Sequence, residues 1–274
     1  MERRINEIKK FLSDNDAALI MSDTNRLYFT GFKSSAGAVL ITKSDAYLLI
    51  DFRYFENACK NINHLQVKLT SRLFSDVDKI LKNKKIENIY IETDYTTLDA
   101  ISTLRKSLTD INISTENTLS KKILKMRSIK EKQEIEYIEK AQSLTDEAFG
   151  YILNHIKTGV SETEIALKME FFMRERGSEG VAFDFIVVSG KNSSLPHGVP
   201  TDKKIENGDF VTMDFGAVIN GYRSDMTRTV AVGSVTQKQQ TVYETVLKAQ
   251  KAALGIIKPD VPCSTVDKTA RDII

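Results

Sequence analysis

The sequence has 274 residues, 41% of them hydrophobic and 28% charged, which is the composition of an ordinary globular protein and excludes a disordered chain. A formal net charge of +2 gives no electrostatic reason to expect nucleic acid or a membrane surface as partner. At about 100–200 residues per domain, this length predicts two domains.

The first half of the chain alternates helical and strand patterns, which predicts an α/β (α+β) domain. Two of its apolar runs flank the turn-forming segment Thr42-Lys43-Ser44-Asp45 and predict a β-hairpin. The predicted elements are a helix at residues 5–14, a strand at 17–21, strands at 37–41 and 46–50, a helix opening at 55–59, a strand at 89–92 and a helix at 97–108.

A basic stretch at residues 121–130, KKILKMRSIK, separates two patterned regions. We place a domain boundary there and take residues 1–125 as the first domain and 126–274 as the second. Ser128 and Glu131 have the spacing of a capping box, so a long helix is predicted to start at this point.

The second half begins with helical patterns and then changes to the period of strands. The predicted elements are the long helix to about residue 157, a helix capped by Ser161 that ends near Gly177, a strand at 183–188, strands at 209–219 and 222–232, a helix from Thr236 to about residue 254, and a last helix capped by Ser264.

The dipeptide Asn220-Gly221 is the strongest two-residue hairpin signal in the chain. With a turn at that place, Ile219 pairs with Tyr222 and Gly216 pairs with Asp225. Side chains alternate along each strand, so one face of the hairpin is apolar except for Arg228. The polar face carries Thr212, Asp214, Gly216, Asp225, Thr227 and Thr229.

Asp214 and Asp225 are diagonal neighbours on this polar face, about 7–8 Å apart at the backbone. Two carboxylates so close raise each other's pKa unless a cation lies between them. A metal ion, or two ions about 3.5–4 Å apart, would neutralise both, and carboxylate oxygens suit manganese, cobalt, zinc or iron. Thr227 and Thr229 are placed to support the carboxylates by hydrogen bonds. Spacing alone leaves open the alternative of two solvated aspartates.

The remaining signals are less specific. Cys59 and Cys263 form no CxxC pair, which argues against a disulfide framework or a zinc ribbon. The charged N-terminus has no apolar signal core and no run is long enough to cross a bilayer, so we expect a cytoplasmic protein without a membrane partner. We interpret His155 as a packed or capping residue near a helix end, and His64 as exposed.

Several segments together resemble one family. They are SSLPHG at residues 193–198, NGDFVTMDFG at 207–216, NGYRSDMTRT at 220–229, and, in the first half, RLYFTGF at 26–32 and LLIDFRYFE at 48–56. The chain resembles bacterial Xaa-Pro aminopeptidases and Xaa-Pro dipeptidases (prolidases) over essentially its whole length. These are pita-bread metallopeptidases with a creatinase-like N-terminal domain.

The resemblance implies a peptidase that cleaves the bond between an N-terminal residue and a following proline. Asp214 and Asp225 match two of the five ligands of two divalent metal ions (manganese, cobalt or zinc). His197 matches the histidine that binds substrate and stabilises the tetrahedral intermediate, and Phe183 and Ile186 match positions that line the substrate pocket. The resemblance also implies a homodimer that acts on proline-containing peptides.

The chain departs from the family pattern after Asp225. The other three ligands, a histidine and two glutamates, are expected further along, yet His197 is the last histidine of this sequence. We therefore expect a truncated pita-bread domain that supplies only two ligands, from a fragment or a disrupted gene. The alternative functions are a non-catalytic pita-bread module that binds peptides or proteins, or an inactive fragment. The two retained aspartates favour descent from an active enzyme.

The segment Asp51-Phe52-Arg53-Tyr54 allows two interpretations. Similar segments in relatives contact the active site of a partner subunit, which is one possible role. A salt bridge at the end of a strand is the other, and the sequence favours neither.

Overall fold

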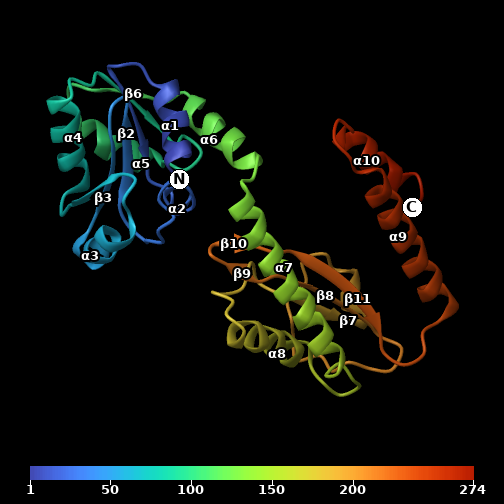
Figure 1. Cartoon of the computed structure of the whole chain (residues 1–274). Helices are drawn as coiled ribbons and strands as arrows, with labels where there is room; N and C mark the ends of the chain where they lie inside the picture. Colours follow the sequence, from blue (N-terminus) through green and yellow to red (C-terminus); the bar gives the residue numbers. More distant parts are fainter. The chain divides into compact units, whose positions relative to one another are not determined.

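The computed structural model describes all 274 residues, which form two compact units, Met1–Lys130 and Glu131–Ile274. Each unit is described by itself (Figure 1). The division lies after Lys130, whereas the sequence analysis placed the boundary inside helix α6 (Thr118–Ser128). The helix belongs to the first unit because Leu119 and Ile123 are buried in its core.

The first unit is built on a six-stranded mixed sheet in the order β4-β3-β2-β1-β5-β6. Strand β1 pairs antiparallel with β2 and parallel with β5. All residues of β1, β2 and β3 are buried, because helices cover both faces of the sheet. The strands are β1 (Asp16–Ile20), β2 (Ala38–Thr42), β3 (Ala46–Ile50), β4 (Gln66–Leu69), β5 (Asn88–Ile91) and β6 (Asn112–Ser114).

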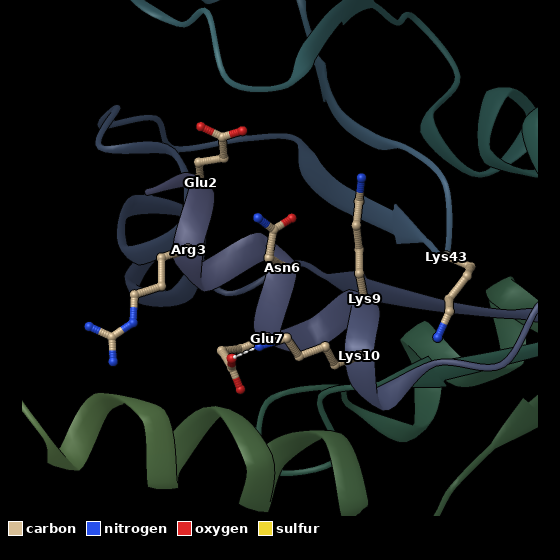
Figure 2. A pocket seen from close by; sticks show the side chains of 7 residues that line it. All are labelled: Glu2, Arg3, Asn6, Glu7, Lys9, Lys10 and Lys43. Carbon is tan, nitrogen blue, oxygen red and sulfur yellow. Dashed lines mark hydrogen bonds and ion pairs between the residues drawn. The ribbon is translucent and has the colours of Figure 1, made fainter.

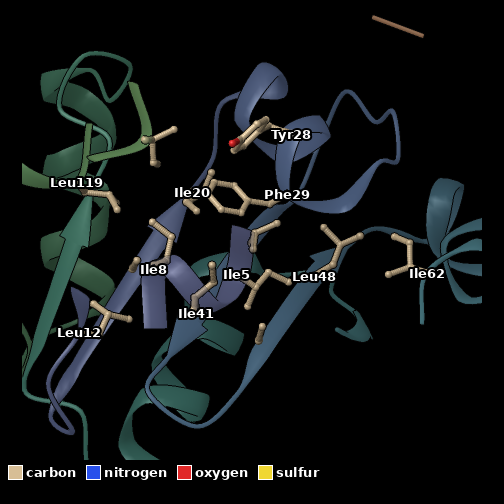
Figure 3. Packing of buried hydrophobic residues seen from close by; sticks show 14 of the residues in the cluster. Ile5, Ile8, Leu12, Ile20, Tyr28, Phe29, Ile41, Leu48, Ile62 and Leu119 are labelled. Atoms are coloured by element: carbon tan, nitrogen blue, oxygen red, sulfur yellow. The ribbon is translucent and has the colours of Figure 1, made fainter. Parts of the chain in front are cut away.

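Two hydrophobic cores lie on the two sides of this sheet. On one side the core is formed between the sheet and four helices, and it includes Ile41 of the sheet with Ile8 and Phe29 of the helices (Figure 3). The helices are α1 (Glu2–Phe11), α2 (Asp23–Thr30), α3 (Phe52–Asn61) and α6. On the other side Val77 and Leu104 contribute to the second core, from the helices α4 (Leu73–Asn83) and α5 (Leu98–Ser107).

The predicted hairpin of the first unit is confirmed as β2 and β3. The sequence analysis missed α2, α4, α6, β4 and β6. Strand β4 has no fully buried residue, so its sequence lacks the apolar alternation that would predict a strand. The segment from Asp51 to Tyr54 begins α3 rather than ending a strand. The Asp51 carboxylate accepts a hydrogen bond from the Arg53 backbone N–H and pairs with its guanidinium at 2.6 Å.

The second unit places two helices, α7 (Lys132–Leu153) and α8 (Glu162–Glu175), on one face of a three-stranded antiparallel sheet. The strand order is β11-β8-β7, and Val211, Met213 and Phe215 of the central strand are fully buried under the helices. The polar residues of the sheet therefore lie on the face that these helices leave free. The strands are β7 (Ile186–Ser189), β8 (Phe210–Phe215) and β11 (Met226–Ala231).

The capping box of α7 lies three residues later than predicted. It is formed by Glu131 and Glu134, and the predicted box of Ser128 and Glu131 is wrong. Ser128 is the last residue of α6, where its hydroxyl donates to the Lys125 carbonyl oxygen. A glutamate can take the place of serine because its carboxylate also accepts from the N3 backbone N–H.

The hairpin register is confirmed, but the two long predicted strands are interrupted. Ile219 pairs with Tyr222 in a short separate ladder of β9 (Val218–Ile219) and β10 (Tyr222–Arg223). The break occurs where Gly216 lies so close to Ser224 that a Cβ atom would overlap the Ser224 carbonyl oxygen. Strand β7 likewise begins only at Ile186, not at residue 183.

The chain continues into α9 (Gln237–Ile256) and α10 (Cys263–Arg271). The predicted capping box of Thr236 and Gln239 is confirmed, whereas α10 has Pro262 instead of Ser264 at its N-cap. Along α9, three aliphatic side chains are more than half exposed: Val242, Val246 and Leu254. None of the helices combines the length and apolarity that a bilayer crossing requires.

Candidate functional site

The two aspartates singled out in the sequence lie close together on the polar face of the second unit's sheet. Asp214 is half-buried in β8 and pairs across the ladder with Thr227. Asp225 is exposed and lies between β10 and β11. Since Thr227 and Asp225 are two positions apart, Asp225 is the diagonal neighbour of Asp214, as the register predicted.

The surroundings of Asp214 disfavour its negative charge. Burial raises the pKa of this carboxyl above its usual range, and a hydrogen bond from Thr227 opposes that effect. The charge of Asp225 and a hydrogen bond between the two carboxyls raise the pKa further, whereas positive charge on His197 lowers it. Asp225 and His197 therefore both act electrostatically on Asp214.

One oxygen of Asp214 has no partner in the protein. Oδ1 is buried and accepts no hydrogen bond, which costs about 1–3 kcal/mol for a polar atom removed from water. A divalent cation fits this place, because carboxylate oxygens are its preferred ligands and its charge would relieve the repulsion between the two aspartates. The 274 residues contain no group of three or more histidine, cysteine or acidic side chains arranged to hold a metal ion.

His197 lies in the segment that follows the 3₁₀ helix η1 (Gly190–Ser194) and is exposed. The next residue, Gly198, is buried, and a Cβ atom there would come within 2.6 Å of Val188 Cγ1. Only glycine therefore allows the chain to approach β7 at this point. This close approach places His197 beside β7, the strand that pairs with the Asp214 strand β8.

A groove of about 510 Å³ is lined by His197 and by residues of α8. Besides His197 it is lined by Thr163, Ala166, Leu167, Glu170, Val181, Asp184, Phe185, Ile186, Gly198, Val199 and Pro200. Ile186 also pairs with Asp214 across the ladder, so the groove adjoins the aspartates. Phe183 lies in the segment before β7 and is not part of the lining.

The two threonines predicted to support the aspartates have different surroundings. Thr227 lies directly opposite Asp214 in the ladder, and its hydroxyl lowers the pKa of the Asp214 carboxyl. Thr229 instead bonds Thr212, with 2.9 Å between the hydroxyl oxygens. The register explains this difference, because it places Thr229 opposite Thr212, two ladder positions from the pair of Thr227 and Asp214.

A buried acid that the sequence patterns did not indicate bonds residues on both sides of His197 in the chain. Glu162 is fully buried at the start of α8, and its carboxylate accepts hydrogen bonds from Ser189 and Thr201. The sequence shows an acidic residue in a first helical turn, where the helix dipole favours it. Nothing local to Glu162 indicates that its partners lie 27 and 39 residues away.

Glu162 predicts a pH-dependent contribution to stability. Burial raises the pKa of its carboxyl, but the hydrogen bonds from Thr201 and Ser189 outweigh burial and hold the pKa below its ordinary value of 4.5. A depressed folded-state pKa stabilises the protein above the unfolded-state value, and that contribution is lost as the pH falls through the folded-state value. We expect Glu162→Gln to lower the free energy of unfolding by about 2 kcal/mol at pH 7.

The difference in the free energy of unfolding between wild type and Glu162→Gln should shrink steadily as the pH falls below 4.5. Urea unfolding at a series of pH values measures it, and Glu164→Gln on the same helix is the control. Glu164 is about half exposed and pairs only loosely with Lys168 at 3.8 Å. A difference that stays constant from pH 7 to pH 3 would contradict the assigned role.

Other polar places in the molecule do not assemble a site. An open hollow of about 540 Å³ on α1 is lined by charged side chains, with Glu7 paired to Lys10 at 2.8 Å (Figure 2). The His155 ring packs on the Tyr151 ring near the end of α7, and His155 Nδ1 is hydrogen-bonded to the Tyr151 carbonyl oxygen. Both contacts agree with the predicted packing or capping role. His64 is half-buried rather than exposed, because Nε2 lies 3.0 Å from the Phe29 carbonyl oxygen.

Comparison with known proteins assigns both units to described families. Residues 136–274 match the model of metallopeptidase family M24, and residues 4–129 match the creatinase/prolidase N-terminal domain. An Xaa-Pro dipeptidase of Pyrococcus furiosus is 37% identical over 277 residues, which cover 100% of this chain and 77% of that protein. The uncharacterized peptidase YqhT of Bacillus subtilis is 37% identical over 94% of this chain and 73% of its own length.

Solved structures agree with this assignment. An Xaa-Pro dipeptidase from Bacillus anthracis superposes with a TM-score of 0.94 at 36% identity and covers 99% of this chain and 76% of its own. An X-Pro aminopeptidase from Thermotoga maritima gives 0.90 at 33% identity, over 97% and 77%. The expected fold, a creatinase-like domain followed by a pita-bread metallopeptidase domain, is confirmed. The chain belongs to metallopeptidase family M24.

Proposed function

We propose that this protein is a metal-dependent peptidase that hydrolyses the bond between an N-terminal residue and a following proline. The observation that carries the proposal is the diagonal pairing of Asp214 with Asp225, with one buried carboxylate oxygen left without a donor and His197 lowering the pKa of Asp214. The named activities of the Pyrococcus furiosus and Bacillus anthracis relatives support the same reaction.

We assign metal binding to Asp214 and Asp225 as two ligands of a pair of divalent ions, manganese, cobalt or zinc. Bound ions of this kind supply a Lewis acid that polarises the peptide carbonyl and makes a water molecule nucleophilic at neutral pH. Thr227, which is paired with Asp214 across the ladder, is assigned to support that carboxylate, as outer-shell partners of ligands do.

His197 is assigned to the substrate. Its exposed side chain lines the groove, where a ring N–H can donate to the carbonyl oxygen as that oxygen gains negative charge. Ile186 lies between the groove and Asp214 and shapes the apolar wall beside the scissile bond. Phe183 is also predicted to contact the substrate. Proline-containing peptides are the proposed substrates.

Metal binding and cleavage can be tested together. We expect Ala-Pro to be hydrolysed in the presence of Mn²⁺ or Co²⁺, while Ala-Ala, which lacks the tertiary amide, is cleaved at least about 10-fold more slowly. The assay is run on this chain and on any longer product of the same gene, with metal content measured on both. Absence of bound metal and of Ala-Pro cleavage from every form would contradict the proposal and favour a peptide-binding module.

Two further predictions accompany this function. A cytoplasmic location is supported by Cys59 and Cys263, which are both exposed and unpaired, the state expected in a reducing compartment. A homodimer is predicted as well, and sedimentation equilibrium of the purified protein would measure it.

A further inference from the structure

One buried carboxylate ties down both ends of the segment that carries His197. Oε1 of Glu162 accepts hydrogen bonds from the backbone N–H and the hydroxyl of Ser189, at 2.6 and 2.8 Å. Oε2 accepts from the backbone N–H and the hydroxyl of Thr201, at 3.1 and 2.6 Å. The chain between these two residues, 190–200, is thereby closed into a loop on a single side chain of α8.

The loop between the two anchors packs on the sheet through η1 and Gly198, and the Thr163 backbone N–H also donates to the Thr201 carbonyl oxygen. Leu195, Pro196 and His197 are exposed, and Gly198 is the only buried residue between the anchors. Its internal backbone hydrogen bonds, such as that from Gly198 to Leu195, shape the loop but do not hold it to the sheet. The position of His197 therefore depends on the packing of Gly198 against β7 and on where the ends of the loop are fixed.

A lysine sets the direction of the hydrogen bonds in this network. Lys203 Nζ donates to the Ser189 hydroxyl oxygen at 3.0 Å and pairs with Asp209 at 2.7 Å. A hydroxyl that accepts from an ammonium group has its own proton free to donate, and here that proton goes to Glu162. The buried carboxylate thus has four donors, which is the arrangement a charged group needs away from water.

We propose that Glu162 is a positioning residue for His197, acting through the loop and not on the substrate. The inference rests on the proposed role of His197 in peptide cleavage. Glu162 is fully buried and does not line the groove, so it has no access to a bound peptide. Its function is to hold Ser189 and Thr201 together so that the imidazole stands beside Asp214.

The test compares Glu162→Gln with the control Glu164→Gln. A glutamine has one acceptor oxygen and one donor group, so it can satisfy one end of the loop while its NH₂ faces the donors of the other. We expect kcat for Ala-Pro to fall about 10-fold or more, because small misplacements of a reacting group are costly. KM and metal content should change less than about 3-fold, and the control should match wild type.

A second measurement reads the loop directly and needs no activity. The chain has three histidines, so selective labelling of histidine rings gives one set of NMR signals for each. In Glu162→Gln the signals of His197 should shift or broaden, while those of His64 and His155 stay in place. A purely structural role would lower stability without singling out His197.

Variants at the anchors keep the test decisive if Glu162→Gln does not fold. Thr201→Val and Ser189→Ala each remove one hydroxyl donor and leave the backbone N–H in place. Each should change the His197 NMR signals and kcat in the same direction as Glu162→Gln, but by less. When either is combined with Glu162→Gln, the further change in these two readouts should be small. Unchanged His197 signals and kcat in folded variants would overturn the inference. If wild type itself fails to cleave Ala-Pro, the proposed function fails, while the NMR signals still decide the role of Glu162.

Discussion

The Asp214→Asn variant is expected to lose divalent-metal binding and at least about 100-fold of Ala-Pro hydrolysis. The amide removes a negative charge from a residue with a buried oxygen that has no donor in the protein. Replacing even an outer-shell partner of a metal ligand costs about 10- to 100-fold, so replacing a direct ligand should cost more. Isothermal titration with Mn²⁺ and the hydrolysis rate measure the two effects.

The same substitution should stabilise the metal-free protein. Burial and the nearby Asp225 charge both disfavour the Asp214 carboxylate, and asparagine removes that penalty at nearly constant shape. We expect the free energy of unfolding without metal to rise by about 1 kcal/mol. Asp202→Asn, at an exposed position of the same unit, is the control for both measurements. Wild-type Mn²⁺ affinity in Asp214→Asn would remove Asp214 from the metal site.

The His197→Ala variant is expected to lower kcat by about 10²- to 10³-fold while metal binding stays intact. This is the usual loss when one hydrogen-bond donor to a developing oxyanion is removed. Stability should change by less than about 0.5 kcal/mol, because the exposed imidazole has no packing role. Steady-state kinetics with Ala-Pro and a Mn²⁺ titration give the comparison.

His197→Gln separates the donor from the bulk of the ring. Glutamine keeps an N–H group of similar reach, so it should recover part of the rate lost in His197→Ala. A kcat within about 3-fold of wild type in the alanine variant would show that His197 is not needed for the chemical step. Loss of metal binding in either variant would instead assign His197 to the metal ions.

Much of the geometry of the candidate site follows from the sequence near one turn. Asn220-Gly221 fixes the pairing of Ile219 with Tyr222, and strand alternation then assigns every residue from Thr212 to Thr229 to a face. The break at Gly216 did not disturb this result, since the register continues unchanged from β9 and β10 into β8 and β11. The diagonal placement of Asp214 and Asp225 therefore needed only local rules.

Local rules were less reliable where several elements compete for the same residues. The spacing of Ser128 and Glu131 fits a capping box, but Ser128 is taken up by α6 because Leu119 and Ile123 pack into the first core. The box then forms at Glu131 and Glu134. Strand β4 was missed for a related reason. It is a strand because it pairs with β3, and its own residues show no apolar pattern.

The sequence by itself determined the hairpin, its polar face and the two aspartates, because a two-residue turn and strand alternation act over neighbouring positions. Only the tertiary structure decided that His197 approaches Asp214, that Phe185 lines the groove where Phe183 does not, and that Glu162 holds the histidine loop. Those contacts join elements far apart in the chain, and they form because packing α8 against β7 removes Glu162 from water and leaves Ser189 and Thr201 as its donors.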